Sequence, residues 1–284
     1  MNDAERKFYW YLPTLVEVKK ENYIQLKDTL IVYPGSLFKR SKDTTVNNYE
    51  YLIFESIPVL KFHSIGGGAL PFKLKQFMRR SMRRVRDSQS KYVILDLRDN
   101  RGGNVLFLKH ILKYFIKEEF KVWDETHLKE SAYTRASIQK FTPFKFLLPL
   151  INYPVKPVTE NRSSVNLKKN GYAGNVILMT NQNTFSAGAM LVDSFKRNSL
   201  GVIVGEQYAS SELHSFGQNE QFTLPKTSIK GYISTWEYSR KINYGVDYFK
   251  VDYLISPQIS ESNSNEDNLL RLVIENIKSG KFKD

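Results

Sequence analysis

The stretch that decides the fold is NVILMTNQNTFSAGA, residues 175–189, where an apolar segment leads through a serine-containing turn into a helical pattern. Residues 175–180 are apolar and rich in side chains that favour strands. Beyond the turn, apolar residues such as Met190, Leu191 and Phe195 recur at helical spacing. The sequence therefore predicts a strand, a tight turn and a helix, with Ser186 on the turn.

Ser186 has two possible roles on such a turn. The turn presents the serine hydroxyl at the edge of a sheet, and the next backbone N–H groups point the same way. An acyl-transfer nucleophile needs this arrangement, because the oxyanion that develops during the reaction requires donors beside it. The alternative is that Ser186 caps the following helix, which is a common role of serine. This segment alone favours the cap, and the rest of the chain bears on the choice.

Composition excludes several classes of site. The chain has 284 residues, 41% of them hydrophobic, which suffices for one large α/β domain or two small ones. It has no cysteine, so disulfides, thiolate metal sites and cysteine nucleophiles are excluded. No two of its four histidines have metal-ligand spacing on one helix face, and we expect neither a metal nor a cofactor. No apolar run approaches the roughly 20 residues that a membrane span requires.

The N-terminus begins MNDAERK and continues directly into aromatic residues. It lacks the apolar segment of a signal peptide. We therefore expect either a cytoplasmic protein or a sequence that does not start where its precursor starts.

The formal net charge of +13 raises the question of nucleic-acid binding. The densest basic cluster is RRSMRRVR, residues 79–86, which reads as an amphipathic helix with arginines on its outer face. Aromatic residues are not interleaved with these arginines, and no glycine-rich loop accompanies them, so we expect no nucleic-acid partner. The outer face is then either simply solvated or a contact surface for an anionic surface or an acidic partner.

From Ile57 onward the chain alternates strands and helices, which is typical of parallel-sheet crossovers. The predicted elements are strands 58–63, 92–97, 175–180 and 201–205, antiparallel strands 221–224 and 229–236, and helices 71–86, 105–117 and 267–278. Residues 8–51 look strand-like. Residues 121–172 are irregular and proline-rich, as a lid or a binding insertion would be.

The loop DLRDNRGG, residues 96–103, follows a buried strand and precedes a helix, where α/β sheets place functional loops. Its adjacent glycines allow a ligand to approach the backbone and leave N–H groups available to donate. The asparagine and the charged side chains can pin the turn by bonding to its backbone. The alternative is a plain turn with a buried Asp–Arg contact. It is not a phosphate loop, because the closing Lys-Ser/Thr is missing.

Five segments, in order, resemble motifs of one family. Residues 94–103 are similar to a "DLRxNxGG" loop, 175–189 to a strand followed by "TxSAxE", 201–206 to "GxxxxGE", and 221–225 and 255–259 to two further strands. The chain thus resembles, over roughly residues 57–278, the C-terminal processing (tail-specific) serine peptidases. That family includes the tricorn protease core and the non-proteolytic interphotoreceptor retinoid-binding proteins.

The resemblance implies an α/β fold with a crotonase/ClpP-like αββ spiral core in residues 56–284, interrupted by an insertion at about 120–172. Residues 1–55 would form a small N-terminal β-rich segment. Ser186 would be the nucleophile, and the oxyanion hole would combine the N–H of Ala187 with the loop of Gly102 and Gly103. Protein or peptide substrates would be cleaved near their C-termini, without a cofactor. No PDZ module is evident, so either recognition would fall to the insertion or a PDZ module has been lost. Relatives usually act outside the cytoplasm.

The chain departs from the family pattern at the residue that would act as the general base. Many members activate the serine with a lysine in "GExTxGKG", and here that position is Ser211. Two histidines are candidates instead, His63 at the end of a strand and His214 just past the missing lysine, with a carboxylate such as Glu212 or Glu237 to orient the ring. The alternative is a catalytically silent relative that binds peptides or apolar ligands.

Overall fold

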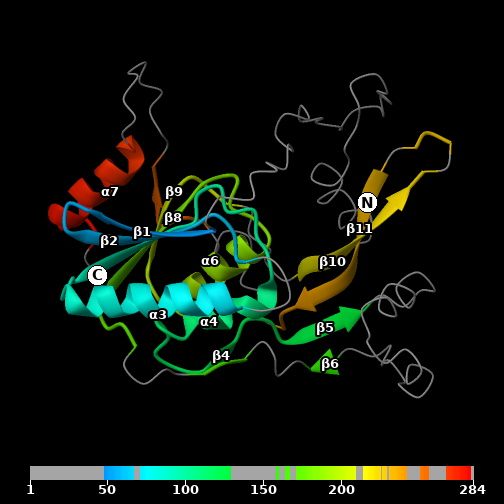
Figure 1. Cartoon of the computed structure of the whole chain (residues 1–284), viewed down its shortest axis with the longest axis horizontal. Coiled ribbons are helices and arrows are strands. Elements are labelled where there is room, and N and C mark those ends of the chain that lie inside the picture. The colour runs from blue at the N-terminus through cyan, green and yellow to red at the C-terminus, as the bar shows by residue number, and fades with distance from the viewer. Residues whose placement is uncertain are drawn as a thin grey trace. The chain divides into compact units, whose positions relative to one another are not determined.

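A computed structural model describes most of the chain from residue 48 onward (Figure 1). The described residues are 48–66, 71–128, 158–159, 164–166, 171–208, 214–224, 226–228, 230–241, 250–255 and 267–282. The strand-like residues 8–47, most of the insertion, and Ser211 and Glu212 lie outside them.

The central element is a six-stranded sheet with the order β1-β2-β3-β8-β9-β12. Its strands are β1 (Tyr49–Phe54), β2 (Ile57–Phe62), β3 (Tyr92–Asp96), β8 (Asn175–Thr180), β9 (Val202–Gly205) and β12 (Tyr253–Leu254). All neighbouring pairs are parallel except β1 and β2, which form an antiparallel hairpin at one edge. The α/β class predicted from the sequence is confirmed, and strand 175–180 has the predicted bounds.

Helices cover both faces of this sheet, which explains the continuous apolar runs in β3 and β8. Figure 1 shows the sheet between α7 on one side and α3 on the other. The helices are α3 (Phe72–Asp87), α4 (Lys109–Leu112), α6 (Ala187–Arg197) and α7 (Asn268–Lys278). Predicted helices 71–86 and 267–278 are thus confirmed to within a residue at each end.

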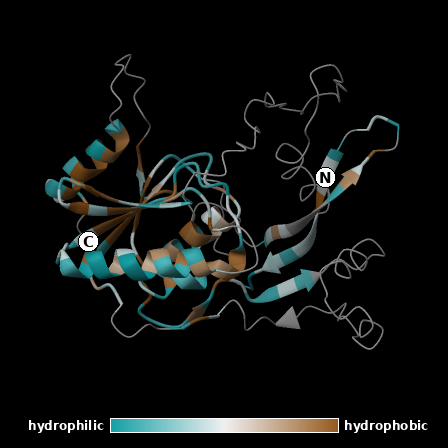
Figure 2. Cartoon of the chain, viewed as in Figure 1, coloured by the Kyte–Doolittle hydropathy of each residue, from teal (hydrophilic) through white to brown (hydrophobic). Residues whose placement is uncertain are grey.

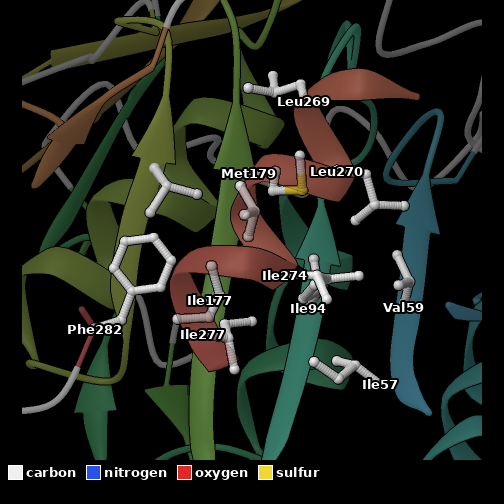
Figure 3. Packing of buried hydrophobic residues seen from close by; sticks show 12 residues of the cluster. Ile57, Val59, Ile94, Ile177, Met179, Leu269, Leu270, Ile274, Ile277 and Phe282 are labelled. Carbon is white, nitrogen blue, oxygen red and sulfur yellow. The ribbon is translucent and has the colours of Figure 1, made fainter. Parts of the chain in front are cut away.

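One face of the sheet is buried by α7, as Figure 3 shows. Alternate residues of three adjacent strands, such as Val59, Ile94 and Ile177, pack against Val273 and Ile274 of the helix, and all five are fully buried. Side chains alternate between the two faces of a strand, so the intervening residues face the other layer. Phe62 accordingly meets Phe77 of α3, with ring centroids 5.7 Å apart.

The predicted helix 105–117 is wrong in its length and regularity. The chain forms a 3₁₀ turn over Val105–Phe107, started by the side chain of Asn104, and then only four residues of α-helix. Hydrogen bonds of the shorter i to i+3 type return after it, as from Tyr114 to Ile111. Branched and aromatic side chains have lower helix propensity than leucine or alanine, and here their burial decides the conformation.

The chain divides into two compact units. The larger comprises Asn47–Thr126, Val158–Ser215 and Tyr238–Asp284, and it contains the six-stranded sheet and the four helices named above. The smaller comprises Met1–Val46, His127–Pro157 and Phe216–Glu237.

Two further sheets are present. Strands β10 (His214–Thr223), β11 (Lys230–Ser239), β5 (Glu125–Leu128) and β6 (Val158–Thr159) form a sheet in the order β10-β11-β5-β6, and β4 (Phe120–Lys121) pairs with β7 (Ser164–Val165). Three of these short strands, β5, β6 and β7, and the second residue of β4 thus lie in residues 121–172, which were predicted to be irregular. None of the helices that the structure describes is long and apolar enough to cross a membrane.

His110 of α4 gives a testable pH dependence. Burial, and then the positive charges of Lys75, Lys113 and Lys109, lower the pKa of His110 from 6.5 to about 4. Between these two values the unfolded chain binds a proton that the folded chain does not, so acidification favours unfolding. We expect His110→Gln to reduce the loss of stability between pH 6.5 and pH 4, measured by urea unfolding at a series of pH values. Parallel stability curves for the two proteins would contradict the assignment.

Candidate active site

Two loops lie side by side at the carboxyl ends of β3 and β8. The strands are adjacent and parallel, and Asp96 at the end of β3 stands opposite Met179 of β8. Residues 97–103 therefore emerge next to residues 181–186. The carboxyl edge of a parallel sheet is where α/β proteins commonly place their ligands.

Backbone and side-chain hydrogen bonds join the two loops. The N–H of Leu97 donates to the carbonyl of Met179 at 2.9 Å, and the N–H of Phe185 donates to the carbonyl of Asn100 at 3.1 Å. The fully buried Thr184 hydroxyl donates to the Leu97 carbonyl at 2.7 Å. The loops thus form one structure, although more than 80 residues separate them in the sequence.

Asn100 fixes the glycine loop from within. Its side chain is fully buried, its Nδ2 donates to the carbonyl of Phe62 at 2.7 Å, and its Oδ1 accepts from the N–H of Gly102 at 2.9 Å. The side chain therefore ties the loop to the end of β2 and sets the path of its own backbone. The prediction that the asparagine pins the turn by bonding to its backbone is confirmed. Gly188 lies against Asn100, since a Cβ atom added there would be 2.7 Å from Oδ1.

A charged cluster holds the start of the same loop. It contains a buried Asp–Arg contact, as the alternative interpretation of this loop predicted. Arg98 bonds both carboxylate oxygens of the buried Asp96, at 2.9 Å and 2.7 Å, and pairs with Asp267. Asp267 also caps α7 by accepting from the N–H of Leu270. Burial raises the pKa of Asp267, but the bonds from Arg98 and Leu270 outweigh it and hold the pKa below its usual value. The loop is thereby attached to the N-terminus of α7.

The outer part of the turn is tied by amides. Asp99, with φ of 60°, accepts from the side chains of Asn181 and Asn183 at 3.0 Å and 2.8 Å. Burial raises the pKa of Asp99, but these bonds and the nearby Arg98 and Lys61 more than offset that effect, so its pKa is lowered.

Ser186 stands directly before α6 in an uncommon backbone conformation. Its φ of 55° and ψ of −128° fall where residues with a side chain are rarely found. Such a conformation costs about 1–3 kcal/mol and persists only where the surroundings enforce it. Its side chain accepts no hydrogen bond from the helix N–H groups, so the interpretation of Ser186 as a side-chain cap is wrong.

Gly102 lies against this serine. A Cβ atom added to Gly102 would be 2.6 Å from the Cβ of Ser186, 2.9 Å from its Oγ and 3.0 Å from the N of Ala187. The φ of Gly102 is also positive, at 92°. Only glycine meets both conditions, and the structure thus brings together the predicted residues Gly102, Ser186 and Ala187.

The remaining backbone donors differ in what they bond. The N–H of Gly102 already donates to Asn100. Within the described residues, the N–H groups of Gly103 and Ala187 have no hydrogen-bond acceptor. Gly103 forms a parallel bridge with Ile65, which places its backbone beside the segment that follows β2.

The two candidate histidines lie at different places in the larger unit. His63 directly follows β2, and its Nε2 is 2.6 Å from Oε1 of Glu50 on β1. His214 is the first residue of β10. Among the described contacts, the Ser186 hydroxyl bonds neither ring. Glu50 was not predicted as a partner, since its position opposite Lys61 depends on the register of the β1–β2 hairpin.

Comparison with known proteins gives the family. Residues 56–233 match the family model described as peptidase family S41. The chain belongs to this family. A search of curated proteins found no match. The resemblance seen in the sequence is therefore confirmed for the chain as an S41 member, and the two loops of the candidate site both fall inside the matched residues.

Solved structures that resemble this S41 chain include a putative peptidase from Parabacteroides merdae, at 16% identity and a TM-score of 0.49, covering 83% of this chain and 66% of the other. The photosystem II D1 C-terminal processing protease gives 12% identity and a TM-score of 0.46, covering 76% of this chain and 50% of the other. A lipoprotein from Streptococcus agalactiae gives 17% identity and a TM-score of 0.47, covering 82% of this chain and 70% of the other. The chain spans about half to two thirds of the length of the first two.

The close approach of Gly102 to Ser186 predicts a large effect of one methyl group. We expect Gly102→Ala to lower the free energy of unfolding by about 3 kcal/mol, because it adds backbone strain and an overlap with Ser186. Urea unfolding measures this loss. Gly280 also has a positive φ, of 76°, and Gly280→Ala is the control for strain alone. Equal losses in the two variants would show that contact with Ser186 is unimportant.

Proposed function

We propose that this S41 chain is a serine peptidase that cleaves protein or peptide substrates near their C-termini through an acyl-enzyme on Ser186. The observation that carries the proposal is the conformation of Ser186, which is strained, does not cap its helix and abuts a glycine backbone. Strain of this kind costs stability, and a nucleophile gains from it because the hydroxyl is held beside backbone donors.

The oxyanion hole would use the N–H groups of Ala187 and Gly103. Both lack an acceptor among the described residues, whereas the N–H of Gly102 is bonded to Asn100. Gly102 would contribute instead by its lack of a side chain, which leaves room for the reacting carbonyl next to Ser186. The Asn100 bonds would keep Gly103 in place during the reaction.

His63 is the general base that we favour. A base in serine hydrolases is oriented by a third group, and Glu50 already holds one nitrogen of the His63 ring at 2.6 Å. With Nε2 donating to Glu50, Nδ1 is left to accept the proton of Ser186 and later return it to the leaving amine. His214 is the alternative base, favoured by its place just after Ser211, which occupies the position of the family lysine.

Other parts of the proposal rest on the family resemblance. They are the crotonase/ClpP-like spiral for the core, a catalytic domain over residues 56–284 after a β-rich segment 1–55, recognition of substrate by the insertion at about 120–172, endopeptidase activity, and action outside the cytoplasm. A catalytically silent member that binds peptides or apolar ligands is the second candidate. Two observations favour it: Ser211 stands at the lysine position, and no base among the described residues is bonded to Ser186.

Covalent labelling tests the nucleophile. We expect a fluorophosphonate to add once to the wild-type chain and not at all to Ser186→Ala, as measured by intact mass, because only an activated serine attacks phosphorus readily. Ser279→Ala, which removes an exposed hydroxyl at the end of α7, is the matched control and should label normally. Folded wild-type protein that takes no label between about pH 6 and 9 would support the silent relative.

The base is tested by the rate of the same reaction. We expect His63→Ala to slow labelling about 100-fold and Glu50→Gln to slow it about tenfold, since general-base assistance contributes 10²–10⁴ and an orienting group less. A larger loss in His214→Ala than in His63→Ala would assign the base to His214.

A further inference from the structure

The outer face of α3 carries an unusual concentration of positive charge. Seven of the sixteen residues of this helix are exposed lysines or arginines, and one is an acid. The cations are Lys73, Lys75, Arg79, Arg80, Arg83, Arg84 and Arg86. Figure 2 shows the visible side of the helix as largely hydrophilic. We call these residues, together with Phe72, the α3 basic face.

Most of these charges have no carboxylate partner in the part of the chain that the structure describes. Nε of Arg83 is 3.9 Å from Oδ2 of Asp87, and because both side chains are exposed, this ion pair contributes little to stability. Arg84 lies over the ring of Tyr51 on β1, at 5.2 Å from its centroid. None of the other five cations pairs with a described carboxylate. No carboxylate among the described residues therefore relieves the mutual repulsion of these five cations.

Apolar side chains are exposed at the same place. Phe72 is 69% exposed at the first position of α3, and helical periodicity puts it in line with Gln76, Arg79 and Arg83 at the centre of the outer face. On β1, two residues after the tyrosine that Arg84 covers and on the same face of the strand, Ile53 is 64% exposed. A phenylalanine in a row of arginines is of no use to a helix that is merely solvated.

We infer that the α3 basic face binds an anionic phospholipid surface, with α3 lying along it. At 1.5 Å per residue the helix is about 24 Å long, which is enough to reach several headgroups. A guanidinium group can donate two parallel hydrogen bonds to one phosphate group. An aromatic side chain at the helix end can enter the boundary between headgroups and acyl chains. A lipid surface would take up both the charges and the exposed Phe72 and Ile53, whereas a nucleic acid would use the charges alone, so lipid is the occupant that fits both features. This attachment is peripheral and does not depend on peptidase activity.

Vesicle sedimentation of the full chain tests this inference. We expect binding to phosphatidylcholine vesicles that contain about one third phosphatidylglycerol, no binding to phosphatidylcholine alone, and release at high salt. Arg79→Gln/Arg80→Gln/Arg83→Gln should weaken binding about 100-fold, at about fivefold per charge. Phe72→Ser should weaken it about tenfold while the salt dependence remains.

The control variant removes three exposed lysines elsewhere, at Lys226, Lys230 and Lys281. Equal weakening in the control and in the arginine variant would overturn the inference, because binding would then follow net charge alone. Absence of binding to anionic vesicles at low salt would also overturn it, as would binding of the basic face to heparin but not to vesicles.

Hydrogen exchange of the wild-type chain serves if the arginine variant does not fold. Vesicles of the same composition should slow amide exchange in residues 72–87 and leave residues 268–278 of α7 unchanged. Protection that is absent from α3, or equal in the two helices, would contradict the inference.

Discussion

The buried side chain of Asn100 is the constraint on which the candidate site depends. It bonds the carbonyl of Phe62 on one side and the N–H of Gly102 on the other, and its own backbone carbonyl accepts from Phe185. One residue thus connects the end of β2, the glycine loop and the turn that carries Ser186. An amide is required, because the site needs a donor and an acceptor on the same side chain, and a buried group that lost either partner would cost about 1–3 kcal/mol.

The strain at Ser186 is sustained by the close packing around this amide. Gly102 lies against Ser186 and Gly188 lies against Asn100, and neither position has room for a Cβ atom. Gly205, at the end of the neighbouring strand β9, also has no room for a Cβ atom, which would be 2.3 Å from the carbonyl oxygen of Thr180. Small residues at these points allow the backbones of the loops to approach each other closely. Bonds between them then replace the helix cap that Ser186 does not make.

Sequence patterns predicted what depends on local periodicity and failed where distant contacts decide. Strand 175–180 and helix 268–278 follow from apolar spacing, and the asparagine that pins the glycine loop follows from its residue type. Helix 105–117 was wrong because buried branched and aromatic side chains set the local conformation. The Glu50–His63 pair was not predicted, since two residues thirteen apart meet only through the register of a hairpin. The capping role of Ser186 failed because φ and ψ are set by the neighbouring loop.

The position of that hairpin bears on how this S41 chain could activate Ser186 without the family lysine. β1 ends at Phe54, before residue 56, where the family match begins, so Glu50 lies outside the matched residues while His63 lies inside them. Pairing of Glu50 with Lys61 in the antiparallel ladder fixes the carboxylate beside the ring at the end of β2. The segment after His63 then bonds the glycine loop, from Ile65 to Gly102 and from Asn104 to Ile65. If His63 is the base, it is held by the same backbone that shapes the glycine loop, whereas position 211, which corresponds to the family lysine, follows β9 in the sequence.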